Sequence, residues 1–129
     1  MAKFLSEEWG DQVRDALNDD ETARNAAKGV QLTMQQVVNN VPGEGEIRYW
    51  TKIDDGSFEG GRGENPEADV TIIQEYETAA AMNRGELNAQ AAFMQGKIKV
   101  QGNMGKLLQH QGTLQALSQA LGQVPAEYD

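Results

Sequence analysis

The chain has 129 residues, of which 39% are hydrophobic, and its formal net charge is −9 at pH 7. This length predicts a single domain over residues 1–129 that can bury a core without cross-links. The lack of cysteine excludes disulfides and thiolate metal ligands, and the acidity disfavours binding to nucleic acid or to anionic membranes.

The first predicted element is an amphipathic helix that begins after Ser6 and ends near residues 18–20. Ser6 can cap this helix, and Glu7 and Glu8 place negative charge in the first turn, where the helix dipole favours it. Its apolar side is formed by Trp9, Val13, Ala16 and Leu17. Residues 21–27 fit either a loop or a further helical turn.

Alternating apolar and polar side chains predict two strands next, over residues 29–38 and 46–53. One face of the first strand carries Val30, Leu32, Met34 and Val38. In the second strand, one face carries Ile47, Tyr49, Thr51 and Ile53, and the other carries Arg48, Trp50 and Lys52. Asp54-Asp55-Gly56 then predicts a tight hairpin into a third strand over residues 57–60, because Asp-Gly accepts positive φ angles.

The remainder of the chain mixes strands and helices. A fourth strand over residues 69–76 has apolar residues on both faces, which indicates a central position. Thr78 can cap a helix over residues 79–84, and a further helix over residues 88–95 stops at Gly96. A fifth strand follows over residues 97–101. A helical segment over residues 104–121 is expected to be interrupted at Gly112.

Strands and helices do not alternate strictly, which is typical of an α+β fold with helices covering one face of a sheet. One stretch is more specific, and it reads Phe93-Met94-Gln95-Gly96-Lys97-Ile98-Lys99-Val100-Gln101-Gly102-Asn103-Met104. It resembles the signature of the sterol-carrier-protein-2 (SCP-2) domain family, whose members typically read A-F-x-x-G-K-[LI]-K-[VI]-x-G-[DN]-M there. Residues 68–72 and 85–87 resemble two further landmarks of that family, and the resemblance covers residues 28–121.

The resemblance implies a five-stranded, largely antiparallel sheet with helices covering one face. It also implies an apolar tunnel between the sheet and the helices, closed in part by the C-terminal helix. The implied function is the non-enzymatic binding and transfer of a hydrophobic ligand, such as a sterol, fatty acid, fatty acyl-CoA or phospholipid. The candidate lining residues are Trp50 as a gate or wall, Phe93, Met94, Ile98, Val100, Met104, Leu107, Leu108, Leu114, Leu117 and Leu121.

One polar residue falls within the apolar stripe of the last helical segment. Leu107, Leu114 and Leu121 recur every seven residues, and a straight helix would place Gln111 among them. In one interpretation, Gly112 breaks the helix and turns Gln111 toward solvent. In the other, Gln111 faces the cavity and binds the head group of a lipid.

No catalytic, metal or cofactor site is predicted. His110 is the only histidine, and Ser6, Ser57 and Ser118 lie in no nucleophile-elbow motif. We therefore expect a protein that is not an enzyme. The alternative function is an accessory or interaction module of a lipid- or steroid-metabolising enzyme, with no open ligand cavity.

The remaining expectations concern partners and location. The expected partners are a lipid or acyl-CoA ligand and a lipid- or steroid-metabolising enzyme, with weak or no stable membrane association. The acidic residues after Leu5 do not fit a signal peptide, and no apolar run approaches the ~18 residues of a membrane span. These features favour a cytoplasmic protein.

Overall fold

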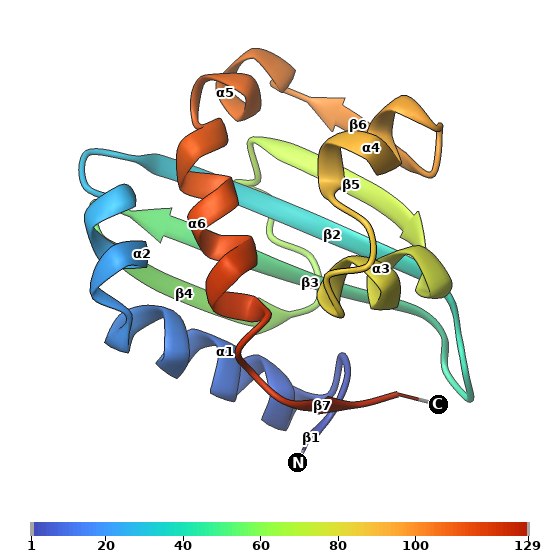
Figure 1. Cartoon of the computed structure of the whole chain (residues 1–129). Coiled ribbons are helices and arrows are strands. Elements are labelled where there is room, and N and C mark those ends of the chain that lie inside the picture. The colour runs from blue at the N-terminus through green and yellow to red at the C-terminus, as the bar shows by residue number, and fades with distance from the viewer. Residues whose placement is uncertain (1, 129) are drawn as a thin grey trace.

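A five-stranded mixed sheet organises the fold, in the order β4-β3-β2-β5-β6 (Figure 1). The computed structural model describes residues 2–128. The strands of this sheet are β2 (Gln31–Val41), β3 (Gly45–Asp54), β4 (Ser57–Arg62), β5 (Val70–Glu75) and β6 (Ile98–Gly102). The neighbours β2 and β5 are parallel and the other three pairs are antiparallel, so the predicted sheet, five-stranded and largely antiparallel, is confirmed.

The predicted hairpin joins β3 to β4. Asp55 has a φ of 45° and Gly56 a φ of 89°, which are the two positive angles that a tight two-residue turn of this kind requires. Ser57 Oγ donates a hydrogen bond to the Asp54 carbonyl oxygen at 2.8 Å and fastens the turn.

In the part of the chain that the structure describes, six helices accompany the sheet, and Figure 1 shows α6 crossing in front of it with α3 and α4 beside α6. They are α1 (Glu7–Asp19), α2 (Glu21–Ala26), α3 (Tyr76–Asn83), α4 (Ala89–Met94), α5 (Met104–Gln109) and α6 (Gln111–Leu121). Within residues 2–128, no helix is both long and apolar enough to cross a bilayer.

Side-chain caps explain where the first two helices begin. Ser6 Oγ accepts a hydrogen bond from the Trp9 amide at 3.1 Å, as predicted for α1. Asp20 Oδ1 accepts one from the Ala23 amide at 3.0 Å and starts α2, so the ambiguous segment is helical.

Two predicted helix boundaries are wrong. The helix expected to start after Thr78 begins directly after β5. Glu75 is its N-cap residue, and the Glu75 side chain makes no capping hydrogen bond to the first turn. The break expected at Gly112 lies at His110, where α5 ends and α6 begins. One glycine in a helix costs only about 1 kcal/mol, and packing of α6 overrides that preference.

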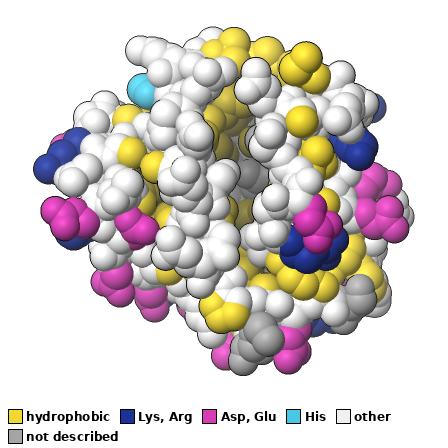
Figure 2. Space-filling model, in the orientation of Figure 1, with side chains coloured by type: hydrophobic (Ala, Val, Ile, Leu, Met, Phe, Trp, Pro, Cys, Tyr) yellow, Lys and Arg dark blue, Asp and Glu magenta, His cyan; other side chains and the backbone are white. Residues whose placement is uncertain are grey.

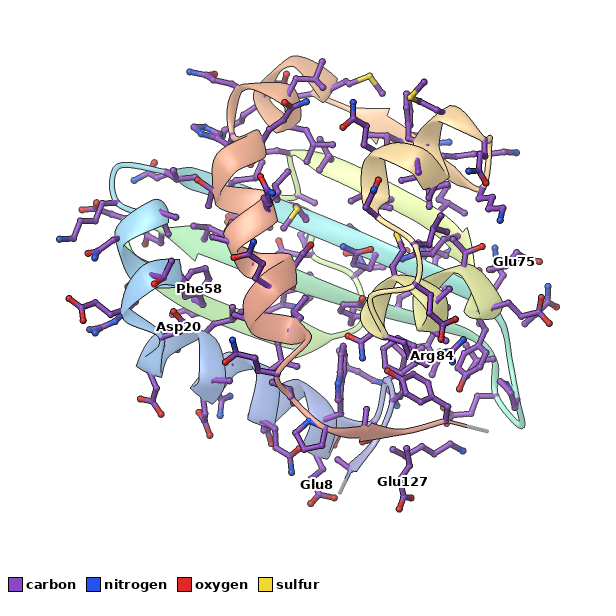
Figure 3. The ribbon with its side chains drawn as sticks, in the orientation of Figure 1. Glu8, Asp20, Phe58, Glu75, Arg84 and Glu127 are labelled. Atoms are coloured by element: carbon purple, nitrogen blue, oxygen red, sulfur yellow. The ribbon has the colours of Figure 1, made fainter. Side chains whose placement is uncertain are left out.

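Two clusters of buried hydrophobic residues lie on the helix-covered side of the sheet. The Trp9 cluster consists of Ala2, Phe4, Leu5, Trp9, Val38, Val41, Ile47, Tyr76, Ala79, Ala80 and Val124. The Leu117 cluster consists of Leu17, Ala23, Ala27, Val30, Leu32, Met34, Ile53, Phe58, Val70, Leu117 and Ala120. Phe58 points inward between sheet and helices, whereas Glu8, Glu75 and Glu127 point into solvent (Figure 3).

A second, two-stranded sheet joins the segments near the two ends of the chain. In it β1 (Ala2–Lys3) runs parallel to β7 (Ala126–Glu127), and the Phe4 amide donates to the Glu127 carbonyl oxygen at 2.8 Å. Strands of two residues carry no readable alternation, so sequence patterns could not reveal this pair.

Candidate functional site

The register of the strands determines which side chains face the helices. In β2, Leu32, Met34, Gln36 and Val38 share the helix-facing side, because side chains alternate along a strand. Leu32 and Met34 belong to the Leu117 cluster, and Val38 belongs to the Trp9 cluster. Gln36 lies between them and belongs to neither cluster.

A row of four residues crosses the sheet at this position. Tyr49, Gln36, Ile72 and Val100 are register partners on β3, β2, β5 and β6. All four are only partly buried. The row lies where the two clusters approach each other: Tyr49 packs against the Trp9 cluster, and Ile72 and Val100 pack against the Leu117 cluster.

The space above this row lies between α6 and the α3–α4 pair. The Leu117 cluster includes residues of α6, and the Trp9 cluster includes Ala79 and Ala80 of α3. Figure 2 shows that the surface is hollowed between these helices, with hydrophobic atoms in the depth of the hollow. On the α6 side, Leu107 and Leu114 are partly buried and pack against the Leu117 cluster.

Two other depressions lack a lining suited to an apolar ligand. One, of about 220 Å³, lies on the opposite side of the sheet and is lined by Gln31, Thr33, Lys52, Asp54 and Asp69. The other, of about 330 Å³, is lined by Lys3, Phe4, Ser6, Glu7, Glu44 and Arg62. Ligand pockets for apolar molecules are lined mainly by hydrophobic side chains, so we place the candidate site in the hollow.

The helix-facing side of the sheet carries two glutamines whose amides meet, Gln36 in this row and Gln74 in the next. Gln74 Nε2 donates a hydrogen bond to Gln36 Oε1 at 3.2 Å. Gln74 is only 6% exposed, and its Oε1 accepts no hydrogen bond from any residue between 2 and 128. Sequence reasoning missed both residues, although each is a polar residue on the apolar face of its strand: Gln36 follows Met34 by two positions, and Gln74 follows Ile72 by two.

The structure brings seven of the predicted lining residues toward the interior. Ile98 and Leu117 are buried. Val100, Met104, Leu107, Leu114 and Leu121 are partly buried. They lie on β6, α5 and α6, and their contact with a ligand stays a prediction.

The remaining apolar candidates are exposed. Phe93 is 44% exposed and Met94 78% exposed, both on α4, and Leu108 on α5 is 56% exposed. Gln111 is also exposed, in the first turn of α6, although the helix break that frees it is at His110 and not at Gly112. A polar contact for a head group therefore has to come from elsewhere in the site.

Trp50 cannot be a wall of this space, which corrects the sequence-based prediction. Its register partner is Gln35, so it lies on the side of β3 that faces away from the helices. Its ring packs closely over Gly61, where a β-carbon would lie 2.9 Å from the ring. The alternation of β3 already placed Trp50 opposite Tyr49, so the pattern itself excluded this role.

The hydroxyl groups that a hydrolase would need have structural roles or lie apart. Ser6 caps α1, Ser57 fastens the β3–β4 turn, and Ser118 is exposed on α6. His110 joins α5 to α6. Among residues 2–128, no three His, Asp or Glu side chains are grouped closely enough to hold a metal ion.

Comparison with known proteins gives consistent matches. Residues 11–115 match the SCP-2 sterol transfer family. A "Fatty acid-binding protein" of Yarrowia lipolytica is 30% identical over 115 residues, which are 86% of this chain and 89% of that protein. A "Sterol carrier protein 2" of Gallus gallus is 31% identical over 74 residues, 57% of this chain and 14% of that longer protein. A crystal structure of sterol carrier protein 2 has a TM-score of 0.82 at 22% identity and covers 95% of this chain and 100% of that one, so the fold is shared.

The signature segment occupies a defined place in this fold. Residues 93–104 form the end of α4, all of β6 and the start of α5. Upstream, Asp69 Oδ2 accepts a hydrogen bond from the Thr33 amide at 2.9 Å, and the Asp69 carbonyl oxygen accepts one from the Asn103 amide at 2.9 Å. Residues 68–72 and the signature segment thus meet at one corner of the sheet. The chain belongs to the SCP-2 sterol transfer family.

Proposed function

We propose that this protein binds the apolar part of a lipid in the hollow between α6 and the α3–α4 pair, and carries it without chemical change. The observation that carries the proposal is the hollow itself, which has hydrophobic atoms in its depth and partly buried leucines on its α6 side (Figure 2). A hollow with apolar walls can take up the apolar part of a bound lipid.

Apolar burial alone supplies enough free energy for such binding. A chain of sixteen carbons that leaves water gains roughly 0.8 kcal/mol per methylene, or about 12 kcal/mol in total. Association costs on the order of 4–15 kcal/mol, so micromolar binding is attainable without a single hydrogen bond. The name of the Yarrowia lipolytica relative, a fatty acid-binding protein, supports a ligand of this class.

Direct binding measurements test the proposal. Purified protein is stripped of bound lipid, and the displacement of the neutral fluorescent dye Nile red is followed as palmitate or 1-hexadecanol is added from a cyclodextrin complex. Native mass spectrometry of the same samples reports the stoichiometry, which we expect to be one lipid per chain. A protein that binds neither the dye nor either lipid would contradict the proposal.

Two substitutions on adjacent residues of β6 locate the site. Val100 is partly buried and faces the helices, whereas Gln101 is exposed and points to the other side of the sheet. Val100→Trp fills the space above the row and should weaken lipid binding by about tenfold or more, since the lost volume matches several methylenes. Gln101→Trp should leave binding unchanged. Equal effects of the two substitutions would place the ligand elsewhere.

A further inference from the structure

The amide of Gln74 is a polar group buried in an apolar part of the sheet. Its register partners are Val38 on β2 and Ile98 on β6, both buried. Its Oε1 accepts no hydrogen bond from any described residue. An unsatisfied buried acceptor destabilises the folded protein, so a molecule that supplies a donor at this point gains affinity.

Gln36 offers the complementary group beside it. Gln36 Oε1 is occupied by Gln74 Nε2, and the structure shows no hydrogen bond from Gln36 Nε2 to another described residue. Gln36 is partly buried in the same row as Ile72, so it is reached from the space between the clusters, whereas Gln74 lies one row further toward α3. The two amides together offer one donor, on the partly buried Gln36, and one acceptor, on the buried Gln74, beside the hollow.

We propose that the Gln36–Gln74 pair binds the hydroxyl group of the lipid and makes the site selective for uncharged, hydroxyl-bearing ligands such as long-chain alcohols and sterols. A hydroxyl donates one hydrogen bond and accepts another, which matches Gln74 Oε1 and Gln36 Nε2. The inference rests on the proposed function, because it assigns the polar end of a ligand whose chain fills the hollow.

The surroundings disfavour an ionised head group at this position. The charged residue that continues the row is Arg62 on β4, and its Nη2 donates to the Leu5 carbonyl oxygen at 2.8 Å. Three strand spacings of about 4.8 Å separate β4 from β5, and Gln74 lies two residues beyond the row on β5, so Arg62 is more than about 14 Å from Gln74. Burial raises the pKa of the Tyr49 phenol above its usual value, so this group stays neutral as well. A carboxylate bound beside Gln74 would thus be too far from Arg62 to form an ion pair with it.

Three sixteen-carbon probes separate the polar contact from apolar burial. These are 1-hexadecanol, palmitate at pH 8 and n-hexadecane, each delivered from cyclodextrin and measured by Nile red displacement. We expect 1-hexadecanol to bind about tenfold more tightly than n-hexadecane, the gain from one or two buried hydrogen bonds. Palmitate should bind more weakly than 1-hexadecanol.

Matched substitutions then assign the preference to the pair. Gln74→Leu keeps the size of the side chain and removes the amide, and should reduce the ratio of 1-hexadecanol to n-hexadecane affinity to about one, while n-hexadecane binds as before. Gln36→Leu should reduce the same ratio. Gln119→Leu, on the exposed side of α6, is the control and should leave it unchanged. The Gln74→Leu protein should melt at the same temperature or higher, since the unsatisfied acceptor is gone.

A measurement on the unchanged protein complements the variants. The side-chain amide resonances of Gln36 and Gln74 in ¹⁵N-labelled protein should shift when 1-hexadecanol binds, and shift less when n-hexadecane binds. The inference is overturned if the affinity ratio is near one in the wild type, or if Gln74→Leu leaves a large ratio unaltered. In both cases alkane binding would still support the lipid carrier, whereas failure of all three probes to bind would remove the carrier and this inference together.

Discussion

The carbonyl oxygen of Asp69 occupies the position that a side chain on Gly102 would need. A β-carbon built on Gly102 would lie 2.5 Å from that oxygen and 3.2 Å from the Val70 α-carbon. Gly102 also has a φ of +100°, a conformation that residues with side chains rarely adopt. The same Asp69 oxygen accepts the Asn103 amide, so β5 and the end of β6 are held in direct backbone contact.

Gly102→Ala is therefore expected to destabilise the protein by at least about 2 kcal/mol, from backbone strain and from overlap with β5. The control is Gly112→Ala in α6, where nothing lies within 4 Å of the added carbon. That substitution should stabilise the helix by about 0.5–1 kcal/mol. Urea unfolding followed by circular dichroism measures both values, and similar stabilities of the two variants would contradict this account of Gly102.

Asp69 joins three segments of the chain through its side chain and backbone. Its Oδ2 accepts from the Thr33 amide at 2.9 Å, and its Oδ1 lies 3.2 Å from Lys106 Nζ. Asp69→Ala should lower the free energy of unfolding by about 1–3 kcal/mol, because the Thr33 amide loses its side-chain acceptor. Asp69→Asn retains that acceptor and Lys106→Met removes only the ion pair, so each should cost about 1 kcal/mol or less. If Lys106→Met proves as damaging as Asp69→Ala, the ion pair matters more than the amide contact.

Two leucines that sequence patterns treated alike should behave differently. Leu117 is 5% exposed within the Leu117 cluster, whereas Leu108 is 56% exposed on α5. Leu117→Ala should destabilise the protein by about 2–5 kcal/mol, since it leaves a cavity. Leu108→Ala should change stability by about 0.5 kcal/mol or less. Thermal and urea unfolding measure both stabilities. A Leu108→Ala protein that is less stable than the Leu117→Ala protein would contradict the placement of α5 and α6.

The pH dependence of the folding stability in acid should include a contribution from Glu86. Arg84 donates two hydrogen bonds to its carboxylate, at 2.8 Å and 3.3 Å, and these bonds, with the attraction between the charges, lower the pKa of Glu86. A carboxyl whose pKa is lower in the folded state stabilises the protein above its unfolded pKa, and that stabilisation is lost as the pH falls through the folded value. Melting temperatures of wild type and Glu86→Gln should therefore differ at pH 7 and converge in acid. A constant difference across the pH range would argue against the pairing.

The sequence predicted the strands of the five-stranded sheet to within a few residues because their side chains alternate between two environments. The β3–β4 turn was equally predictable, since Asp55 and Gly56 are residue types that tolerate positive φ angles. Helix boundaries were harder to predict from the sequence. α3 begins without a side-chain hydrogen bond at its cap, so no local signal marked it, and Gly112 lies inside a helix that tertiary packing maintains.

The candidate site was predicted less well than the fold. Periodicity finds apolar residues but does not tell a cavity wall from a packed core, so Leu117 and Val100 were indistinguishable in the sequence. It also treated Met94, 78% exposed, as interior. The informative residues were the polar exceptions, Gln36 and Gln74, whose pairing depends on the parallel register of β2 and β5. That register has no local signal, and the two glutamines that it brings together are 38 positions apart in the sequence.

The order of the strands also bears on the behaviour of the protein at high concentration. The outer strands, β4 and β6, have six and five residues, and exposed charges at Glu59 and Lys99 interrupt them. Short, charged edges are poor templates for the addition of a strand from another molecule. The sheet is therefore protected against edge-to-edge aggregation at both of its open sides, while the longer strands β2 and β3 stay enclosed within it.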